Sequence, residues 1–129
     1  MILDDIYSWL SDVTALTAIC ADRIYPVNLP QGVEFPCVRF ERDEDGGFKD
    51  FDGQGETIRT EIVFDFIGET LSEATDMADA VRASLKNLTG TFGTRYVQRV
   101  SLEAELDQYD FKIAEGKYRS SQAWTMWHV

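Results

Sequence analysis

The sequence has little of what most catalytic and nucleotide-binding sites are built from. It has one histidine, His128, and its two cysteines, Cys20 and Cys37, fit neither a metal-ligand spacing nor a redox motif. It also lacks a G-x-G-x-x-G motif and a phosphate-cradling G-K-S/T sequence. These shortages argue against an enzyme, since no hydrolase triad can be assembled. We therefore expect no cofactor, two free packing thiols, and His128 at the surface end of a strand.

Basic residues and long apolar runs are scarce as well. Twelve Lys and Arg stand against 23 acids, giving a formal net charge of −11. That excess of acids disfavours tight binding of nucleic acid, because such binding needs clustered cations to neutralise the phosphates. Residues 1–10 lack the basic start of a signal peptide and the apolar length of a membrane segment. We expect a protein made in the cytoplasm that makes no membrane contact.

Proline is confined to one stretch. Pro26, Pro30 and Pro36 are the only prolines, and each fixes φ and removes a backbone donor. We expect residues 26–36 to run extended along a sheet edge, with turns near Asn28 and Gly32. The chain of 129 residues is long enough for one core and too short for two ordinary domains, so one domain spanning 1–129 is predicted.

Apolar spacing predicts three helices. Two short pieces cover residues 2–10 and 13–19, and a long helix begins at Thr70. Thr70 and Glu73 fit a capping box, in which the threonine side chain accepts from the Glu73 amide and the glutamate reaches back. Leu71 to Leu88 then step by three and four residues, and Gly90 lies beyond the helix end.

Alternation of apolar and polar residues predicts four strands, at residues 36–42, 56–68, 94–105 and 117–128. The order is helix, strand, strand, helix, strand, strand, with hairpin-length links inside each strand pair. The expected fold class is therefore α+β, with a mainly antiparallel four-stranded sheet and the long helix packed on one face.

Residues 43–55 are rich in acids and glycine. They hold five acids, four glycines and one lysine, a composition that offers little apolar area to offset chain ordering. We predict a mobile hairpin loop. Asp50 to Glu56 has the oxygen ligands and glycines of a calcium loop, but the spacing departs from the EF-hand pattern, so a solvated loop without metal is preferred.

The last predicted strand has aromatic residues on both faces. Trp124 shares a face with Tyr118 and Met126, whereas Trp127 shares the other with Arg119. We assign Trp124 to the core and Trp127 to an interface between subunits or with a partner. The alternative is a sheet covered on both faces by the chain itself. The predicted interface residues are Trp127, Arg119, Asp43, Glu44, Asp45, Asp50 and Asp52.

Several segments together resemble a known family. They are R-I-Y-P at 23–26, L-P-Q-G at 29–32, a proline opening a strand, an alanine-rich helix at 73–85, and the closing K-Y-R-S-S-Q-A-W-T-M-W-H. This combination resembles the tail-completion, or tail-terminator, proteins of long-tailed (sipho- and myo-type) bacteriophages and phage-like particles.

The resemblance implies a structural virion protein in the tail or neck, assembled in the host cytoplasm. Such proteins form a homo-oligomeric ring, usually a hexamer, on the head-proximal end of the tail tube, where they stop tube growth and face the head connector. The implied partners are the tail tube protein and the connector or stopper protein, and DNA would pass through an acidic lumen without specific binding. Alternatives are a head-side neck adaptor or stopper, and a small cytoplasmic protein-binding module unrelated to virions.

Overall fold

The computed structural model describes residues 2–49, 56–86, 88–92, 95–110 and 116–128. Helices and strands follow one another in mixed order, with the three helices in the first two thirds of the chain. Their bounds are α1 (Ile2–Ser11), α2 (Thr14–Cys20), β1 (Ile24–Pro26), β2 (Cys37–Lys49), β3 (Glu56–Gly68), α3 (Leu71–Leu85), β4 (Gly90–Phe92), β5 (Arg95–Asp110) and β6 (Lys117–His128).

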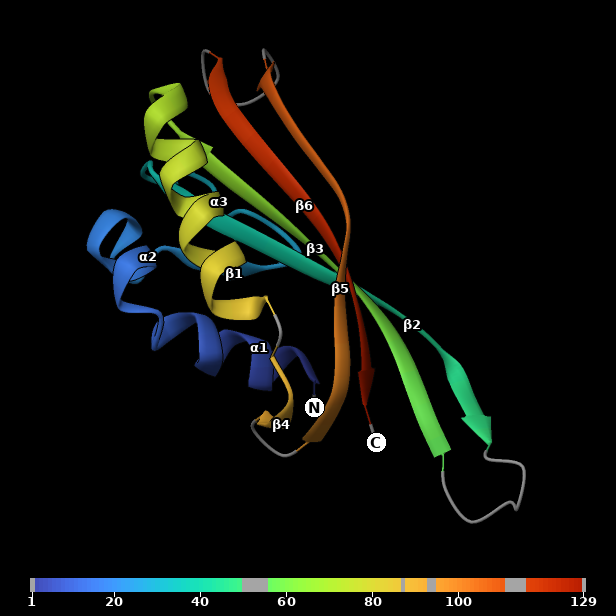
Figure 1. Cartoon of the computed structure of the whole chain (residues 1–129). Coiled ribbons are helices and arrows are strands. Elements are labelled where there is room, and N and C mark those ends of the chain that lie inside the picture. Colours follow the sequence, from blue (N-terminus) through green and yellow to red (C-terminus); the bar gives the residue numbers. More distant parts are fainter. Residues whose placement is uncertain (1, 50–55, 87, 93–94, 111–115, 129) are drawn as a thin grey trace.

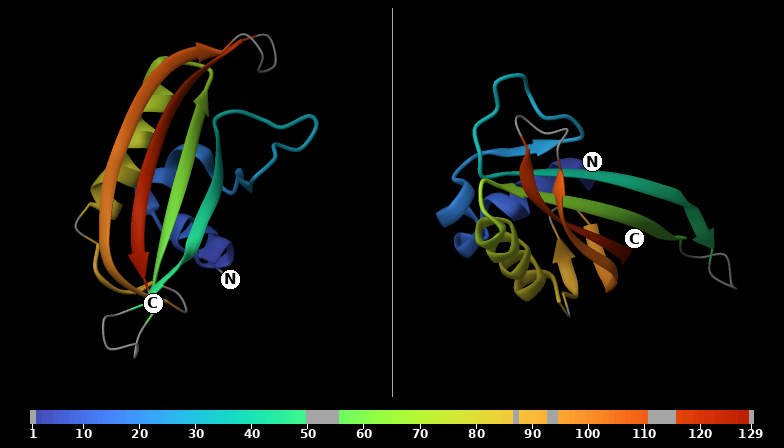
Figure 2. Two further views of the ribbon diagram at one scale, coloured as in Figure 1. Left: turned by 90° about the vertical axis from the view of Figure 1, so that its right-hand side faces the viewer. Right: turned by 90° about the horizontal axis from the view of Figure 1, so that it is seen from above.

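The strands form one mixed sheet in the order β1-β2-β3-β6-β5-β4. β1 runs parallel to β2, and the other pairs are antiparallel. The sheet is strongly twisted and curls into a half-barrel, and all three helices lie on one of its faces (Figures 1 and 2). The predicted mainly antiparallel four-stranded sheet with one packed helix is therefore wrong. β1 and β4 have three residues each, too few for alternation to be visible in the sequence.

The core lies between the sheet and the helices. α1 contributes Ile6 and Leu10, and the two strands β2 and β3 contribute the large side chains Phe40, Phe64 and Phe66, all at most 1% exposed. Burial of each such side chain stabilises the fold by about 1.5–3 kcal/mol. The other elements complete this cluster with Leu16, Cys20, Met77, Val81, Leu85, Val97, Trp124 and Met126.

The predicted start of the long helix is confirmed in atomic detail. Thr70 Oγ1 accepts from the Glu73 amide at 3.2 Å, and Glu73 Oε1 accepts from the Thr70 amide at 3.2 Å. β3 ends two residues earlier at Gly68, where an added Cβ would lie 2.7 Å from the Glu73 Cβ. The glycine therefore permits α3 to fold back onto the sheet directly after β3.

The proline stretch is only partly a sheet edge. Pro26 ends β1, an edge strand, where its missing amide costs no ladder bond. From Val27 to Pro36 the chain forms no strand. The predicted turns are present, since the Asn28 amide donates to the Pro26 carbonyl at 2.7 Å and Gly32 has a φ of +74°.

The predicted acidic loop at residues 43–55 is partly strand in the structure. β2 continues to Lys49, and its backbone pairs Asp43 with Glu61 and Lys49 with Glu56. Pairing along β3 satisfies backbone groups that a loop would leave to water, and a register shift between Asp45 and Phe48 takes up the two glycines. Asp43, Glu44 and Asp45 are therefore strand residues. Asp50, Asp52 and most of the proposed calcium loop lie outside the described residues.

Candidate assembly surfaces

Trp124 belongs to the core, as predicted. It lies on the helix-covered face of the sheet with 3% of its surface exposed, and its Nε1 donates to Gln122 Oε1 at 3.0 Å. Gln122 is also buried, and its Nε2 donates to the Ala78 carbonyl at 2.9 Å and to Glu105 Oε2 at 2.7 Å. This one amide joins α3, β5 and β6, which explains how a glutamine can share the face of Trp124.

Glu105 connects this buried network to the surface. Its other carboxylate oxygen, Oε1, pairs with the guanidinium of Arg82 on α3. Burial opposes ionisation of Glu105, but hydrogen bonds from Arg82 and Gln122 outweigh it and lower the pKa of the carboxyl group. The same hydrogen bond raises the pKa of Arg82. The positive charge of Arg82 is therefore balanced within the subunit, and Asp79 at 3.5 Å adds to that balance.

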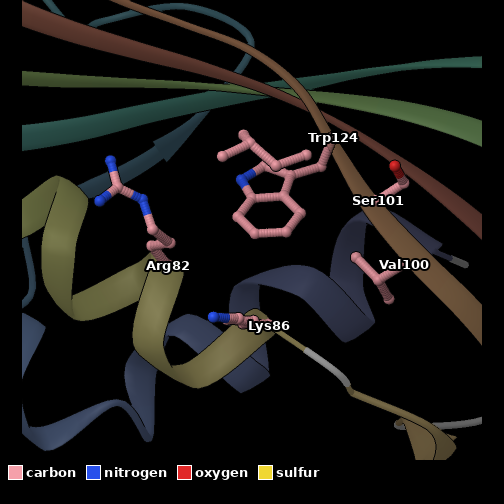
Figure 3. A pocket seen from close by; sticks show the side chains of 6 residues that line it. Arg82, Lys86, Val100, Ser101 and Trp124 are labelled. Carbon is pink, nitrogen blue, oxygen red and sulfur yellow. The ribbon is translucent and has the colours of Figure 1, made fainter.

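A pocket of about 380 Å³ opens beside this network (Figure 3). The C-terminal half of α3 forms one wall and β5 forms the other, with the Trp124 indole between them. Lys86 is exposed at the rim and has no ion pair with any residue in the described part of the chain. The pocket is lined by Arg82, Lys86, Val100, Ser101, Leu102 and Trp124.

None of the helices in the described residues lies on the opposite face of the sheet (Figure 1). Trp127 is half-buried there, and the guanidinium carbon of Arg99 lies 5.1 Å from the centroid of its ring. Arg119, the cation predicted for this face, is paired in register with Gln108 of β5. Trp127 and Arg119 thus share a sheet face away from the helices, whereas Asp43, Glu44 and Asp45 lie along β2. Their assignment to an interface remains a prediction.

An ion-pair network crosses three strands on this face. Arg39 of β2 donates through Nη1 to Asp65 Oδ2 of β3 at 2.9 Å. Asp65 Oδ1 accepts from Ser121 Oγ of β6 at 2.7 Å. The Asp65 side chain is only 11% exposed, whereas Glu41, the second partner of Arg39, is 44% exposed. The Arg39–Asp65 contact is therefore the buried part of the network.

Both long edges of the sheet are open over most of their length. β4 pairs with β5 only from Arg95 to Val97, so residues 98–110 have no outer strand neighbour in the part of the chain that the structure describes. β1 covers β2 only from Val38 to Phe40, which leaves residues 41–49 open in the same sense. Leu102, Leu106 and Tyr109 are 37%, 59% and 43% exposed along the open β5 edge. Unpaired edges with exposed apolar side chains are templates for pairing with another chain.

His128 is not at the surface, contrary to the prediction. Its side chain is fully buried, and its Nε2 lies 2.8 Å from Thr60 Oγ1 of β3. The sequence alone does not indicate this burial, because the residues that pair with His128 in the sheet, Ile58 of β3 and Val97 of β5, are distant in the chain.

Among the described residues, no group of three His, Cys, Asp or Glu side chains could hold a metal ion. None of the described helices is long and apolar enough to cross a membrane.

Cys20 and Cys37 are buried and free, as predicted. Burial raises the pKa of Cys20 from 9.0 to about 11 and that of Cys37 to about 12. We expect neither thiol to react with a thiol reagent at pH 8 in the native protein, and both to react after denaturation. Below pH 9 the thiols are protonated in both states, so they do not change stability. Above pH 9 only the unfolded chain releases these protons, so the free energy of unfolding falls as pH rises towards 11. Rapid labelling of the native protein at pH 8 would contradict this.

A sheet with two open edges and one face without a helix in the described residues is typical of a subunit that assembles with other proteins. The comparisons with known proteins agree with that class. The family model described as Tail completion protein gp17 matches residues 4–116, and the chain therefore belongs to this family of structural tail-completion proteins of phage-like virions.

The fold also occurs in a solved structure. A chain from the structure titled "Virion of native gene transfer agent (GTA) particle" matches with a TM-score of 0.71 and 15% sequence identity. The match covers 96% of this chain and 92% of that one. No curated protein matches the sequence. The structural likeness supports the fold, and the family match supports the role in tail completion.

Proposed function

We propose that the protein is a tail terminator, which forms a ring of six copies on the head-proximal end of the tail tube. The ring ends tube growth and joins the tail to the connector or stopper protein of the head. The match of the tail-completion family over residues 4–116 carries this proposal. The protein would act by binding, without chemical turnover, and would be assembled in the host cytoplasm before it enters the virion.

The charge of the chain suits this position. With a net charge of −11, its surface repels the phosphates of DNA. A ring of such subunits would let DNA pass through its lumen without specific binding. The open edges of β2 and β5 supply two different surfaces for contacts between subunits, which a closed ring with a head-to-tail arrangement requires.

Native mass spectrometry and a head-to-tail joining assay test the proposal. We expect a ring-sized complex of the purified protein, alone at high concentration or on isolated tails. Tails made without the protein should gain it at one end and then join heads, as counted by electron microscopy. Binding to isolated heads, with no binding to tails, would instead indicate a head-side adaptor or stopper. A protein that stays monomeric and binds neither would contradict both roles.

Replacement of Trp127 tests the uncovered sheet face. We expect Trp127→Ala to stay folded, because the side chain is only half-buried and its ring makes a cation–π contact with the Arg99 guanidinium near the surface. If the indole is an interface anchor, the variant should weaken ring formation or tail binding on the order of tenfold to a hundredfold.

Tyr7→Ala is the matched control for this variant. Tyr7 is 41% exposed on α1, on the other side of the sheet. It should assemble like the parent protein, as measured by sedimentation and by tail binding. Equal losses in both variants, or none in Trp127→Ala, would remove Trp127 from the interface.

A further inference from the structure

The two open edges of the sheet are covered at opposite ends. β4 covers residues 95–97 of β5, at the end of that strand that pairs with the last residues of β6. β1 covers residues 38–40 of β2, at the end where β3 finishes. Beyond these short strands, residues 98–110 of β5 and 41–49 of β2 have no outer partner strand among the described residues. Each subunit therefore has two free edges, one on each side of the same sheet.

The directions of the two edge strands suit antiparallel pairing between copies. β2 is antiparallel to β3, β3 to β6, and β6 to β5, so β2 and β5 run in opposite directions. A second copy placed beside the first by rotation about an axis roughly parallel to the strands keeps its own strand directions. Its β2 then lies antiparallel to β5 of the first copy, and antiparallel pairing is the more stable arrangement per residue.

The covered ends are compatible with this pairing. Residues 41–49 of the second copy lie beside 98–110 of the first when β2 is displaced along the strands, so that its β1 lies beyond the end of β5. β4 of the first copy then lies beyond the end of β2. The contact is about 30 Å long, and neither short strand obstructs it. The β2–β3 and β5–β6 hairpins project from opposite ends of the sheet, which leaves room for the displacement (Figure 1).

The free edge of β5 also offers apolar contact. Leu102 and Leu106 are 37% and 59% exposed. The register places Leu102 on the sheet face of Trp124 and Leu106 on the face of Ser121. An added strand would therefore contact one apolar side chain on each face, and on the helix side it would lie beside the pocket between α3 and β5. Backbone pairing at a sheet edge, with side-chain contacts on alternate residues, is a common mode of recognition.

Electrostatic repulsion opposes this contact. Residues 41–49 contain four acids and two bases, and residues 98–110 contain four acids and one base, which gives net charges of −2 and −3. Charged residues on edge strands keep sheets from pairing with one another. We therefore expect free subunits to stay apart in dilute solution at low ionic strength, and salt to promote their assembly by screening the repulsion.

We infer that β5 of one copy pairs with β2 of the next copy as a displaced antiparallel ladder, which the acids of both edges restrain until the subunits are concentrated on a tail. The inference rests on the proposed ring and identifies the strands that close it. Pairing of β5 with β5 about a two-fold axis would also be antiparallel, but it would leave both β2 edges open. The β5–β2 contact covers both edges of every copy, and its repetition closes a ring when the rotation between subunits permits.

Disulfide trapping between two isotopically distinct preparations tests the pairing. One preparation carries Leu106→Cys, and the other carries Asp43→Cys, Glu44→Cys or Asp45→Cys. They are mixed and oxidised, alone and on tails. We expect a mixed-isotope disulfide from at least one of the three positions, because paired residues of antiparallel strands lie within disulfide reach. Tyr96→Cys is the matched control, since Tyr96 is 54% exposed but lies where β4 covers the edge, and it should give no such link.

Hydrogen exchange and charge variants add independent readouts. Assembly should slow amide exchange in residues 41–49 and 98–110 together. A rise in salt from about 0.05 M to about 0.5 M should strengthen assembly about tenfold. Leu106→Glu should stay folded and weaken assembly about tenfold or more, because it removes the apolar contact and adds a like charge at the free edge. Tyr96→Glu makes the same change beside β4 and should assemble within about twofold of the parent.

The outcomes separate the contact from the ring. A ring that joins tails to heads, without mixed-isotope disulfides and with fast exchange in residues 41–49, would overturn the inference and leave the tail-terminator role intact. Disulfides between two Leu106→Cys copies would indicate β5–β5 pairing and would also overturn it, as would protection of β5 by the tail tube protein alone. Assembly that salt weakens would contradict the restraint by charge. A protein that forms no ring and binds no tails would contradict the proposed function, and the inference with it.

Discussion

Trp124→Ala is expected to unfold the subunit or nearly so. The indole is 3% exposed and packs between α3 and the sheet. Removing a buried side chain of this size leaves a cavity and costs about 3–5 kcal/mol. Domains of this size are stable by about 5–15 kcal/mol, so the loss removes a large part of the total. Loss of the indole also removes the donor to Gln122 Oε1. Urea denaturation followed by circular dichroism measures the change.

Trp127→Ala is the matched control in this experiment. It removes the same side chain three residues later, from the face that carries no helix. Its free energy of unfolding should fall by much less than that of Trp124→Ala. If Trp127→Ala is the more destabilising of the two, then the uncovered face contributes more to the core than its exposure indicates, and the assignment of the two faces is wrong.

Arg39→Met is expected to cost about 2–3 kcal/mol at pH 7. The substitution keeps most of the side-chain stem but leaves the Asp65 carboxylate, which is 11% exposed, with Ser121 in place of its cation. An uncompensated charge in a mostly buried position is the main cost. Thermal and urea unfolding measure the change in stability.

Two further variants isolate the cause. Glu41→Gln removes the exposed partner of Arg39 and should change stability by less than about 0.5 kcal/mol. The double variant Arg39→Met/Asp65→Asn removes the buried charge as well and should recover more than half of the loss. A double variant that is no more stable than Arg39→Met would show that the loss comes from packing of the arginine stem.

The sequence predicts the parts of this fold that are local or strongly periodic. The α3 capping box lies within four residues, and the bounds of β6 agree because alternation continues over twelve residues. β5 is less regular. Register shifts between Val97 and Arg99 and between Leu102 and Ala104 break its alternation. Val97 pairs with His128 and Val100 with Met126, so two residues three apart share the core face, whereas Tyr96 is 54% exposed.

Contacts between distant segments account for the rest. The short strands β1 and β4 form because each pairs with a longer strand, β2 or β5. The buried His128 contacts Thr60, which lies 68 residues earlier in the chain. The candidate surfaces follow the same division. Parity on β6 separates Trp124 from Trp127, whereas the pocket rim brings the end of α3 to β5, which no spacing in the sequence indicates.

The strand order has a consequence for synthesis of the chain. The centre of the sheet is the β3–β6 pair, which joins Ile58 to His128 and Gly68 to Tyr118. Each half of the chain can form its own hairpin early, β2 with β3 and β5 with β6. The middle of the sheet closes only when β6 has left the ribosome, and until then one hydrogen-bonding edge of β3 lacks its partner strand.

The two halves therefore resemble two pieces of a split protein, divided after α3. A chain cut between Leu88 and Gly90 should yield an N-terminal fragment that aggregates alone and a C-terminal fragment that rescues it by pairing β6 with β3. Because the β3–β6 pair forms last, the sheet with its two open edges, β2 and β5, is complete only at the end of synthesis. Newly made chains would therefore not assemble with one another before their own sheet is finished.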